Sequence, residues 1–135
     1  AKKAGINLKV NKVPSDGYWA DVWLKNPWCA SYWSGRETED WMFTVGYAAG
    51  GSWNESRWAH PRFNKLLTAA RAELDENKAR DIYWEMQQIC SDEGGSVIPL
   101  FVDHLIGHSD KLAHGKIAGN WDLDGYRCIE KWWFV

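Results

Sequence analysis

The sequence predicts an α/β fold in which a mostly parallel sheet is flanked by helices. Residues 6–10 alternate apolar and polar side chains, residues 15–25 are helix-like, and residues 29–33 form a short apolar segment. A strand, a helix and a strand in close succession form a βαβ unit, whose crossover is nearly always right-handed and whose strands are parallel. Two amphipathic helices and a second apolar segment, residues 97–102, complete the pattern.

In the predicted βαβ unit, particular residues mark where the first strand and the helix begin and end. Ile6, Leu8 and Val10 alternate with polar residues, which is the period of a half-buried strand. Ser15 or Asp16 can cap the helix that follows, and Pro27 stops it because the residue before a proline avoids the α region. The segment before this unit ends in lysines and a glycine, as a helix does at its C-terminus, so we expect a piece cut from a longer protein.

Two amphipathic helices are predicted in the middle of the chain, over residues 61–74 and 77–92. Pro61 suits a first helical turn, and Asp75 suits an N-cap. Because few residues separate the helices, they should form an antiparallel hairpin. The apolar stripes comprise Phe63, Leu66, Leu67, Ala70 and Leu74 in the first helix, then Ala79, Ile82, Tyr83, Met86, Ile89 and Cys90 in the second.

The last third of the chain carries fewer signals. Residues 97–102 predict a buried strand, at an edge or a strand start because Pro99 lacks a donor. The terminus ends in Trp132, Trp133 and Phe134, which need a surface to cover them.

Composition limits the function classes. The 135 residues suffice for one domain, and a formal net charge of −2 gives no electrostatic case for a nucleic acid or an anionic membrane. Three widely spaced cysteines, Cys29, Cys90 and Cys128, do not form a metal motif; one disulfide or three free thiols remain open. The eleven tryptophans are unusual, because each indole offers a large flat contact face.

The best candidate site follows the second strand of the βαβ unit. Ligands of open parallel sheets bind outside the carboxyl ends of the strands, where Trp33 and Arg36 are expected. A glycine-containing loop offers a further aromatic ring and an amide. The acidic residues 37–40 are either a solvated turn with a cap, or they supply a carboxylate to the ligand or to Arg36. The candidate ligand-binding residues are Tyr32, Trp33, Ser34, Gly35, Arg36, Trp53 and Asn54.

Four stretches, in order, resemble motifs of one known family, the extracellular solute-binding proteins of the peptide/nickel class (family 5) that feed ABC importers. The resemblance covers nearly the whole chain and matches the C-terminal part of that family. The stretches are Trp33-Ser34-Gly35-Arg36, then Asn54 to Trp58 with His60 to Leu67, then Ala79 to Tyr83 with Met86-Gln87, and Val97-Ile98-Pro99-Leu100-Phe101.

The resemblance implies a type II periplasmic-binding-protein fold, in which two lobes close on a solute without covalent chemistry or a cofactor. Residues 1–135 would be a C-terminal lobe fragment, with about 115–135 as a return segment toward the missing N-terminal lobe. The implied partners are a small solute and a membrane permease, with no nucleic acid. The implied location is the periplasm, or the cell surface as a lipoprotein.

One residue departs from the family pattern. Peptide-binding members end the first motif with an aspartate that holds the α-amino group of a peptide, whereas this chain has Arg36. A guanidinium prefers carboxylate or phosphate and repels an ammonium group. Arg36 therefore argues against holding a peptide by its α-amino group, unless Glu37, Glu39 or Asp40 supplies the carboxylate. The expected solute is a small anionic or zwitterionic compound, whether opine-like, peptide-like or of another kind.

Two other classes of function fit the sequence less well. An enzyme is disfavoured because the common nucleophile, zinc and phosphate-loop motifs are missing, although Asp122 and Asp124 resemble a carboxylate pair. His104 and His108 are four apart, but their segment does not read as a helix, so no metal site is expected. A tryptophan-rich carbohydrate-binding module is the alternative, disfavoured because such modules are mostly β-sandwiches.

Overall fold

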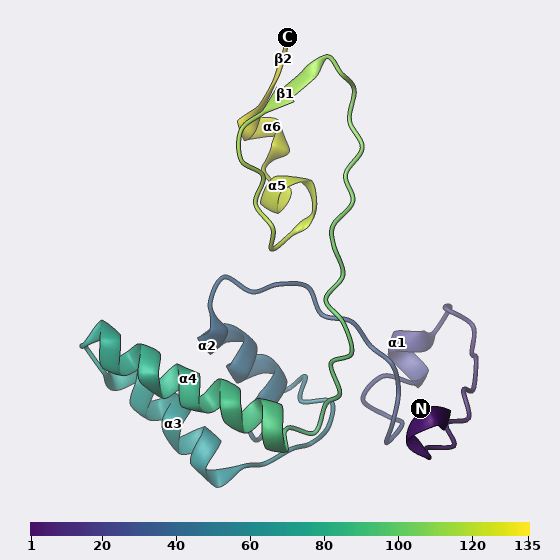
Figure 1. The fold of residues 1–135 in the computed structure, drawn as a ribbon, viewed down its shortest axis with the longest axis vertical. Helices are drawn as coiled ribbons and strands as arrows, with labels where there is room; N and C mark the ends of the chain where they lie inside the picture. Colours follow the sequence, from purple (N-terminus) through teal and green to yellow (C-terminus); the bar gives the residue numbers. More distant parts are fainter. The chain divides into compact units, whose positions relative to one another are not determined.

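The computed structural model describes all 135 residues, which fall into two compact units, Ala1–Ser31 and Tyr32–Val135. The first unit contains one short 3₁₀ turn, Lys2–Ala4, and one helical turn, α1 (Tyr18–Asp21) (Figure 1). Gly5 closes the 3₁₀ turn in the left-handed conformation, with φ of 75°. Three aromatic rings hold the α1 region together, with Trp19 lying 5.6 Å from both Tyr18 and Trp23, measured between ring centroids.

The predicted βαβ unit is wrong. Residues 6–10 and 29–33 have no regular secondary structure and pair with no strand, and the helix between them has four residues. Gly17 precedes α1 in a left-handed conformation and offers no side-chain cap, and Leu24 adopts φ of 59°, so the helix cannot continue to residue 25. Ile6, Leu8 and Val10 are all exposed, so the apolar side chains of the alternating pattern are not buried in a core.

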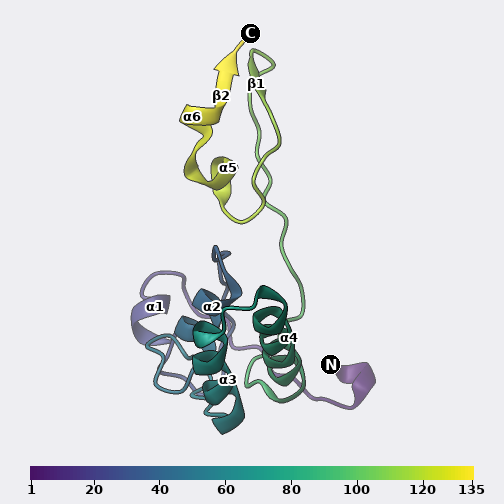
Figure 2. The ribbon, with the colours of Figure 1, turned by 90° about the vertical axis from the view of Figure 1, so that its left-hand side faces the viewer.

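In the second unit, α3 (Pro61–Ala72) and α4 (Glu76–Glu93) confirm the two predicted amphipathic helices. They follow α2 (Glu39–Met42) and a π-helical turn (Phe43–Tyr47). The ribbons of α3 and α4 run side by side as the expected hairpin, with α2 against them (Figures 1 and 2). Arg62 of α3 and Glu85 of α4 form a surface ion pair across the hairpin, with Nη2 2.8 Å from Oε2.

The two long helices begin where their caps place them. Asp75 accepts from the backbone N–H of Asn77 at 2.9 Å and of Lys78 at 3.2 Å, as its position predicts. Pro61 occupies the first turn of α3, but the residue that caps this helix is His60, whose Nδ1 accepts from the N–H of Phe63 at 3.1 Å. The His60 ring stacks on the Trp58 ring, with 5.4 Å between the ring centroids. The Nε2 atom of His60 lies 3.3 Å from Oε2 of Glu93.

The core lies between α3, α4 and the π-helical turn. Phe63 and Met86 are fully buried, and Phe63 meets the Phe43 ring edge-on at 5.2 Å. Burying a large side chain of this kind stabilises the fold by about 1.5–3 kcal/mol. Leu74 is the exception in the predicted stripe, because it follows the last residue of α3 and is 95% exposed. The buried apolar residues are Phe43, Phe63, Leu66, Leu67, Ala70 and Met86.

The C-terminal part forms a small structure around one buried carboxylate. Strands β1 (Leu112–His114) and β2 (Trp132–Phe134) pair antiparallel, and α5 (Asp122–Tyr126) and α6 (Cys128–Lys131) connect to them. Asp124 in α5 is 2% exposed and accepts from the Ala118 N–H at 2.7 Å and the Trp132 indole N–H at 3.0 Å. It also binds Lys131, and these contacts, led by the lysine, lower the pKa of Asp124 to about 2.

The mostly parallel sheet is therefore absent, and with it the sheet core of the predicted α/β lobe. The single sheet has two short antiparallel strands, and helices account for most of the regular structure. Residues 97–102, predicted as a buried strand, are extended and unpaired, with Phe101 92% exposed.

No helix combines the length and the apolar character that a membrane crossing requires. The three cysteines are unpaired.

Candidate ligand site around Arg36

The Arg36 guanidinium lies among four indole rings. Its central carbon is 5.5 Å from the ring centroid of Trp33, 5.6 Å from that of Trp41, 5.9 Å from that of Trp53 and 5.8 Å from that of Trp121. Each distance is within the range of about 6 Å at which a cation is attracted to the negative face of an aromatic ring. We call these four rings the indole box.

The backbone next to Arg36 fixes the guanidinium in the box. The Nη1 group of Arg36 donates to the carbonyl oxygens of Ser34 at 3.2 Å and of Gly35 at 2.9 Å. Gly35 lies directly against Asn120, because a Cβ at position 35 would meet the Asn120 carbonyl oxygen at 2.6 Å. A glycine is needed here so that the segment carrying Trp121 can approach Arg36.

Two of the four indoles also contact each other. Trp33 and Trp53 lie 5.9 Å apart between ring centroids, and the Trp33 indole N–H donates to Glu55 at 3.0 Å. Gly46 lies beneath this ring, since a Cβ there would be 3.5 Å from the Trp33 ring. Trp33 is thus held on two sides, and its face toward Arg36 is preorganised.

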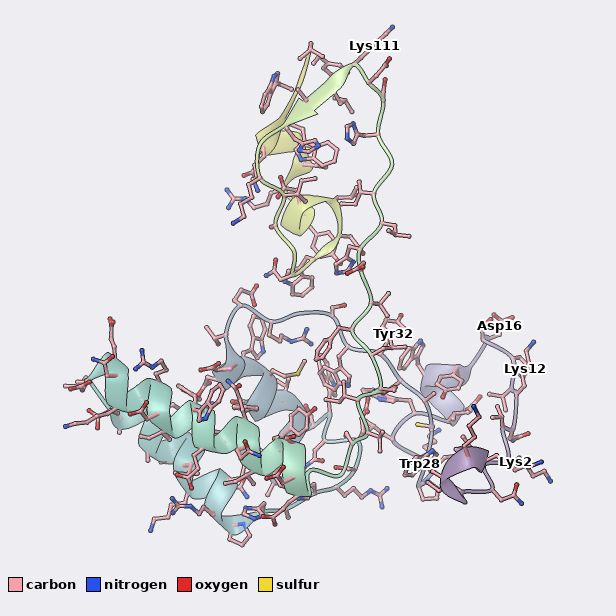
Figure 3. The ribbon with its side chains drawn as sticks, in the orientation of Figure 1. Lys2, Lys12, Asp16, Trp28, Tyr32 and Lys111 are labelled. Carbon is pink, nitrogen blue, oxygen red and sulfur yellow. The ribbon has the colours of Figure 1, made fainter.

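The remaining predicted site residues have different surroundings. Asn54 is 7% exposed, and its amide nitrogen donates to the carbonyl oxygens of Tyr47, Ala48 and Trp58. Its Oδ1 accepts from the Trp58 N–H at 3.1 Å, so this amide orders the loop instead of facing solvent. Tyr32, labelled in Figure 3, is 76% exposed. The structure therefore brings together Trp33, Ser34, Gly35, Arg36 and Trp53, but not Asn54.

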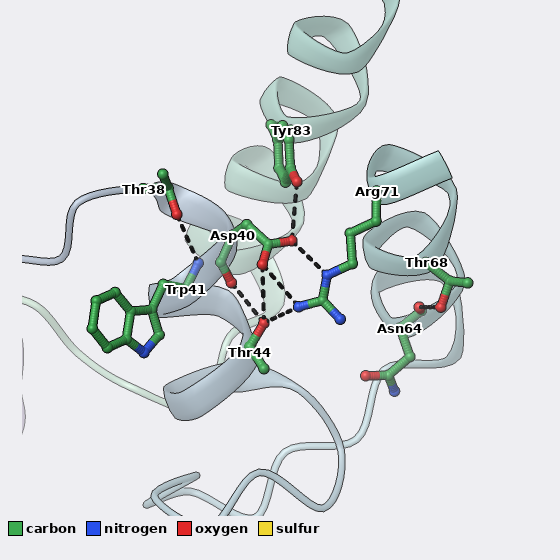
Figure 4. Close-up of polar contacts among 8 residues, drawn as sticks. All are labelled: Thr38, Asp40, Trp41, Thr44, Asn64, Thr68, Arg71 and Tyr83. Atoms are coloured by element: carbon green, nitrogen blue, oxygen red, sulfur yellow. Dashed lines mark hydrogen bonds and ion pairs between the residues drawn. The ribbon is translucent and has the colours of Figure 1, made fainter. Parts of the chain in front are cut away.

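The acidic run does not pair with Arg36. Thr38 caps α2 by accepting from the Trp41 N–H at 3.3 Å, as the capping alternative proposed. Asp40 accepts two hydrogen bonds from Arg71, both at 2.8 Å, and one from the Tyr83 hydroxyl at 3.0 Å (Figure 4). The hydrogen bond from Arg71 is the main cause that lowers the pKa of Asp40, while burial and Asp40 raise the pKa of Tyr83 to about 12.

This arrangement leaves part of the Arg36 guanidinium available. The nearest acidic residues in sequence are engaged elsewhere or exposed, and no carboxylate forms an ion pair with Arg36. Only Nη1 donates to the protein, so the N–H groups of Nε and Nη2 have no protein acceptor. A planar cation with three unused donors and indole walls suits a carboxylate or phosphate that carries an apolar group.

A hollow of about 450 Å³ borders the indole box and shares Trp121 with it. Tyr126 packs against Trp121 at 5.3 Å, and the hollow is also lined by Glu37, Arg127 and Lys131. Its volume is in the range of small-molecule sites. The two cations are already paired, Arg127 with Glu130 at 2.8 Å and Lys131 with Asp124.

The histidines and the C-terminal acids are engaged in local contacts. The Asp122 carboxylate lies 2.7 Å from His104 Nδ1, and Asp124 is the buried acid described above, so the two carboxylates have different partners. No group of three or more histidine, cysteine, aspartate or glutamate side chains is arranged to hold a metal ion. Burial raises the pKa of the Cys90 thiol to about 11, which keeps it protonated.

Sequence reasoning missed two walls of the box, Trp41 and Trp121. Trp41 follows the cap at Thr38 by three residues, so a helix start at Thr38 would have fixed its direction. Trp121 lies far along the chain, and no local pattern relates it to Arg36.

Comparisons with protein-family models, with curated proteins and with solved structures found no match to this chain.

Proposed function

We propose that this chain captures a small anionic or zwitterionic solute for an ABC import system, with Arg36 binding the acidic group of the solute. The observation that carries the proposal is the unpaired Arg36 guanidinium inside four indole rings. The four motif stretches that resemble the solute-binding proteins of the peptide/nickel class add support from the sequence.

The chemistry of the site fits a solute with two kinds of surface. Its carboxylate or phosphate accepts from Nε and Nη2 of Arg36, and its apolar part covers the exposed indole faces and extends into the hollow beside Trp121. A hydrogen bond to a charged group contributes about 1.5–3 kcal/mol, which corresponds to about one to two decades in affinity. No step in this function makes or breaks a covalent bond, and delivery requires a membrane permease as partner in the periplasm or at the cell surface.

A carbohydrate-binding module remains the alternative for a tryptophan-rich chain. Such modules are mostly β-sandwiches, whereas the sheet here has two strands of three residues each. The four convergent indoles surround a cation and do not form an open platform for a sugar ring. The acidic solute is therefore the better fit.

Calorimetry on the 135-residue chain tests the proposal with a panel of dipeptides, opine-like dicarboxylates, phosphorylated compounds and neutral sugars. We expect an acidic compound to bind, and Arg36→Ala to weaken its binding by one to two decades. Arg80→Ala is the matched control, because Arg80 is an exposed arginine on α4 outside the box. Binding of neutral sugars alone, or equal affinities for Arg36→Ala and the original chain, would contradict the proposal.

A further inference from the structure

The indole box is built from parts that do not belong to the Arg36 side chain. The four aromatic walls come from positions 33, 41, 53 and 121, and the two hydrogen-bond acceptors are the backbone carbonyls of Ser34 and Gly35. None of these groups is part of the guanidinium itself, so a different guanidinium could meet the same rings and carbonyls. Together they offer both things that a guanidinium requires, electron-rich faces and carbonyl oxygens.

We infer that the indole box is a binding site for guanidinium-type cations, and that Arg36 occupies it as a tethered internal ligand. The inference goes beyond the proposed capture of an acidic solute and does not rest on it. A guanidino solute would replace Arg36 in the box, donating to the carbonyls of Ser34 and Gly35 while its plane faces the indoles. The site is half-open, since Trp41 is 46% and Trp53 is 43% exposed.

The chemistry selects guanidinium over other small groups. An ammonium ion is more strongly hydrated and gives no planar face, so it gains less from the indoles. A neutral urea has the same plane and similar donors but lacks the charge that the ring faces attract. No carboxylate forms an ion pair with Arg36, so the attraction comes from the rings and the carbonyls.

The first test uses methylguanidinium as the probe and Arg36→Ala as the variant that empties the box. At constant ionic strength, calorimetry should give saturable binding to Arg36→Ala at least tenfold tighter than to the original chain, where Arg36 competes. Methylurea, the neutral analogue, should bind neither protein measurably. Removing one wall with Trp41→Leu in the Arg36→Ala background should weaken binding by about two- to fivefold. Trp84→Leu is the matched control, since Trp84 is an exposed tryptophan of α4 outside the box.

The second test needs no variant and decides the matter if Arg36→Ala does not fold. In nuclear magnetic resonance spectra of the original chain, ring currents from four indoles should shift the Arg36 side-chain protons away from their random-coil positions. Methylguanidinium, kept below denaturing concentrations, should return them toward those positions, and methylurea should not. Arg36 protons that methylguanidinium leaves unmoved, equal affinities for Arg36→Ala and the original chain, or equal binding of methylurea would overturn the inference.

Discussion

The helical hairpin and the extended segment that follows it are both rich in apolar residues, yet only the hairpin buries them. Phe63 of α3 and Met86 of α4 are fully buried, whereas Phe101 is 92% exposed. An α-helix satisfies its own backbone and needs a partner for one face only. A strand needs a neighbour for its N–H and C=O groups before its side chains can form a core. The difference shows that apolar composition predicts burial only where local hydrogen bonding can hold the segment.

The largest expected effect is in the hairpin core. Phe63→Ala should lower the free energy of unfolding by about 3–5 kcal/mol, because it removes a fully buried ring and leaves a cavity. Leu74→Ala is the control from the same predicted stripe, and its effect should stay within about 0.5 kcal/mol because Leu74 is exposed. Urea unfolding followed by circular dichroism measures both. Similar losses in the two variants would contradict the assigned core.

The next effect concerns the polar link between α2 and the hairpin. Asp40→Ala removes the acceptor for Arg71 and Tyr83 and should cost about 2 kcal/mol. Tyr83→Phe removes one hydrogen bond and should cost about 1 kcal/mol. Because the folded pKa of Asp40 lies below that of an unfolded aspartate, about 3.9, this stability is complete above that pH and is lost as the pH falls through the folded value.

Urea unfolding at neutral pH and again in acid tests this link. The original chain should lose part of its advantage over Asp40→Ala as the pH falls below about 4. An advantage that stays constant throughout the acid range would show that the ionised form of Asp40 contributes nothing.

A third effect concerns the buried carboxylate of the C-terminal part. The pKa of Asp124 is lowered to about 2, so its contribution is complete above the unfolded value and lost between about pH 4 and pH 2. In Asp124→Asn the indole N–H of Trp132 should change its resonance at neutral pH, since it loses a charged acceptor. In the original chain the same change should appear only in strong acid. Asp16→Asn, at the exposed residue labelled in Figure 3, should leave the Trp132 signal unaltered.

The smallest effect on folding is expected in the extended segment. Phe101→Ser should change the free energy of unfolding by less than about 0.5 kcal/mol, because the ring is exposed. The substitution should instead lower self-association, measured by light scattering, because segment 97–102 then exposes one apolar side chain fewer. A loss of stability as large as that of Phe63→Ala would show that the segment is buried in solution.

The candidate site residues differ in how well the sequence predicts the direction of their side chains. Trp33, Gly35 and Arg36 are neighbours in the chain, so the order of an aromatic, a small and a cationic residue is enough to predict that they share a site. The amide of Asn54 suggests a ligand contact, but it donates to the carbonyl oxygens of Tyr47, Ala48 and Trp58 and so orders the loop itself. The residue types were informative, whereas the direction of each side chain depended on backbone groups that no motif describes.

Helices α3 and α4 can be predicted from the order of residues alone. Their apolar stripes, Pro61 and the Asp75 cap act within one or two helical turns, and such local interactions can be read directly from the order of residues. The strands and the indole box depend on contacts between residues far apart in the chain. Pairing residues 6–10 or 97–102 with a neighbour is a long-range event, and β1 pairs with β2 instead. Likewise, Trp121 faces Arg36 because Gly35 admits Asn120, a contact between residues 85 positions apart (120 minus 35).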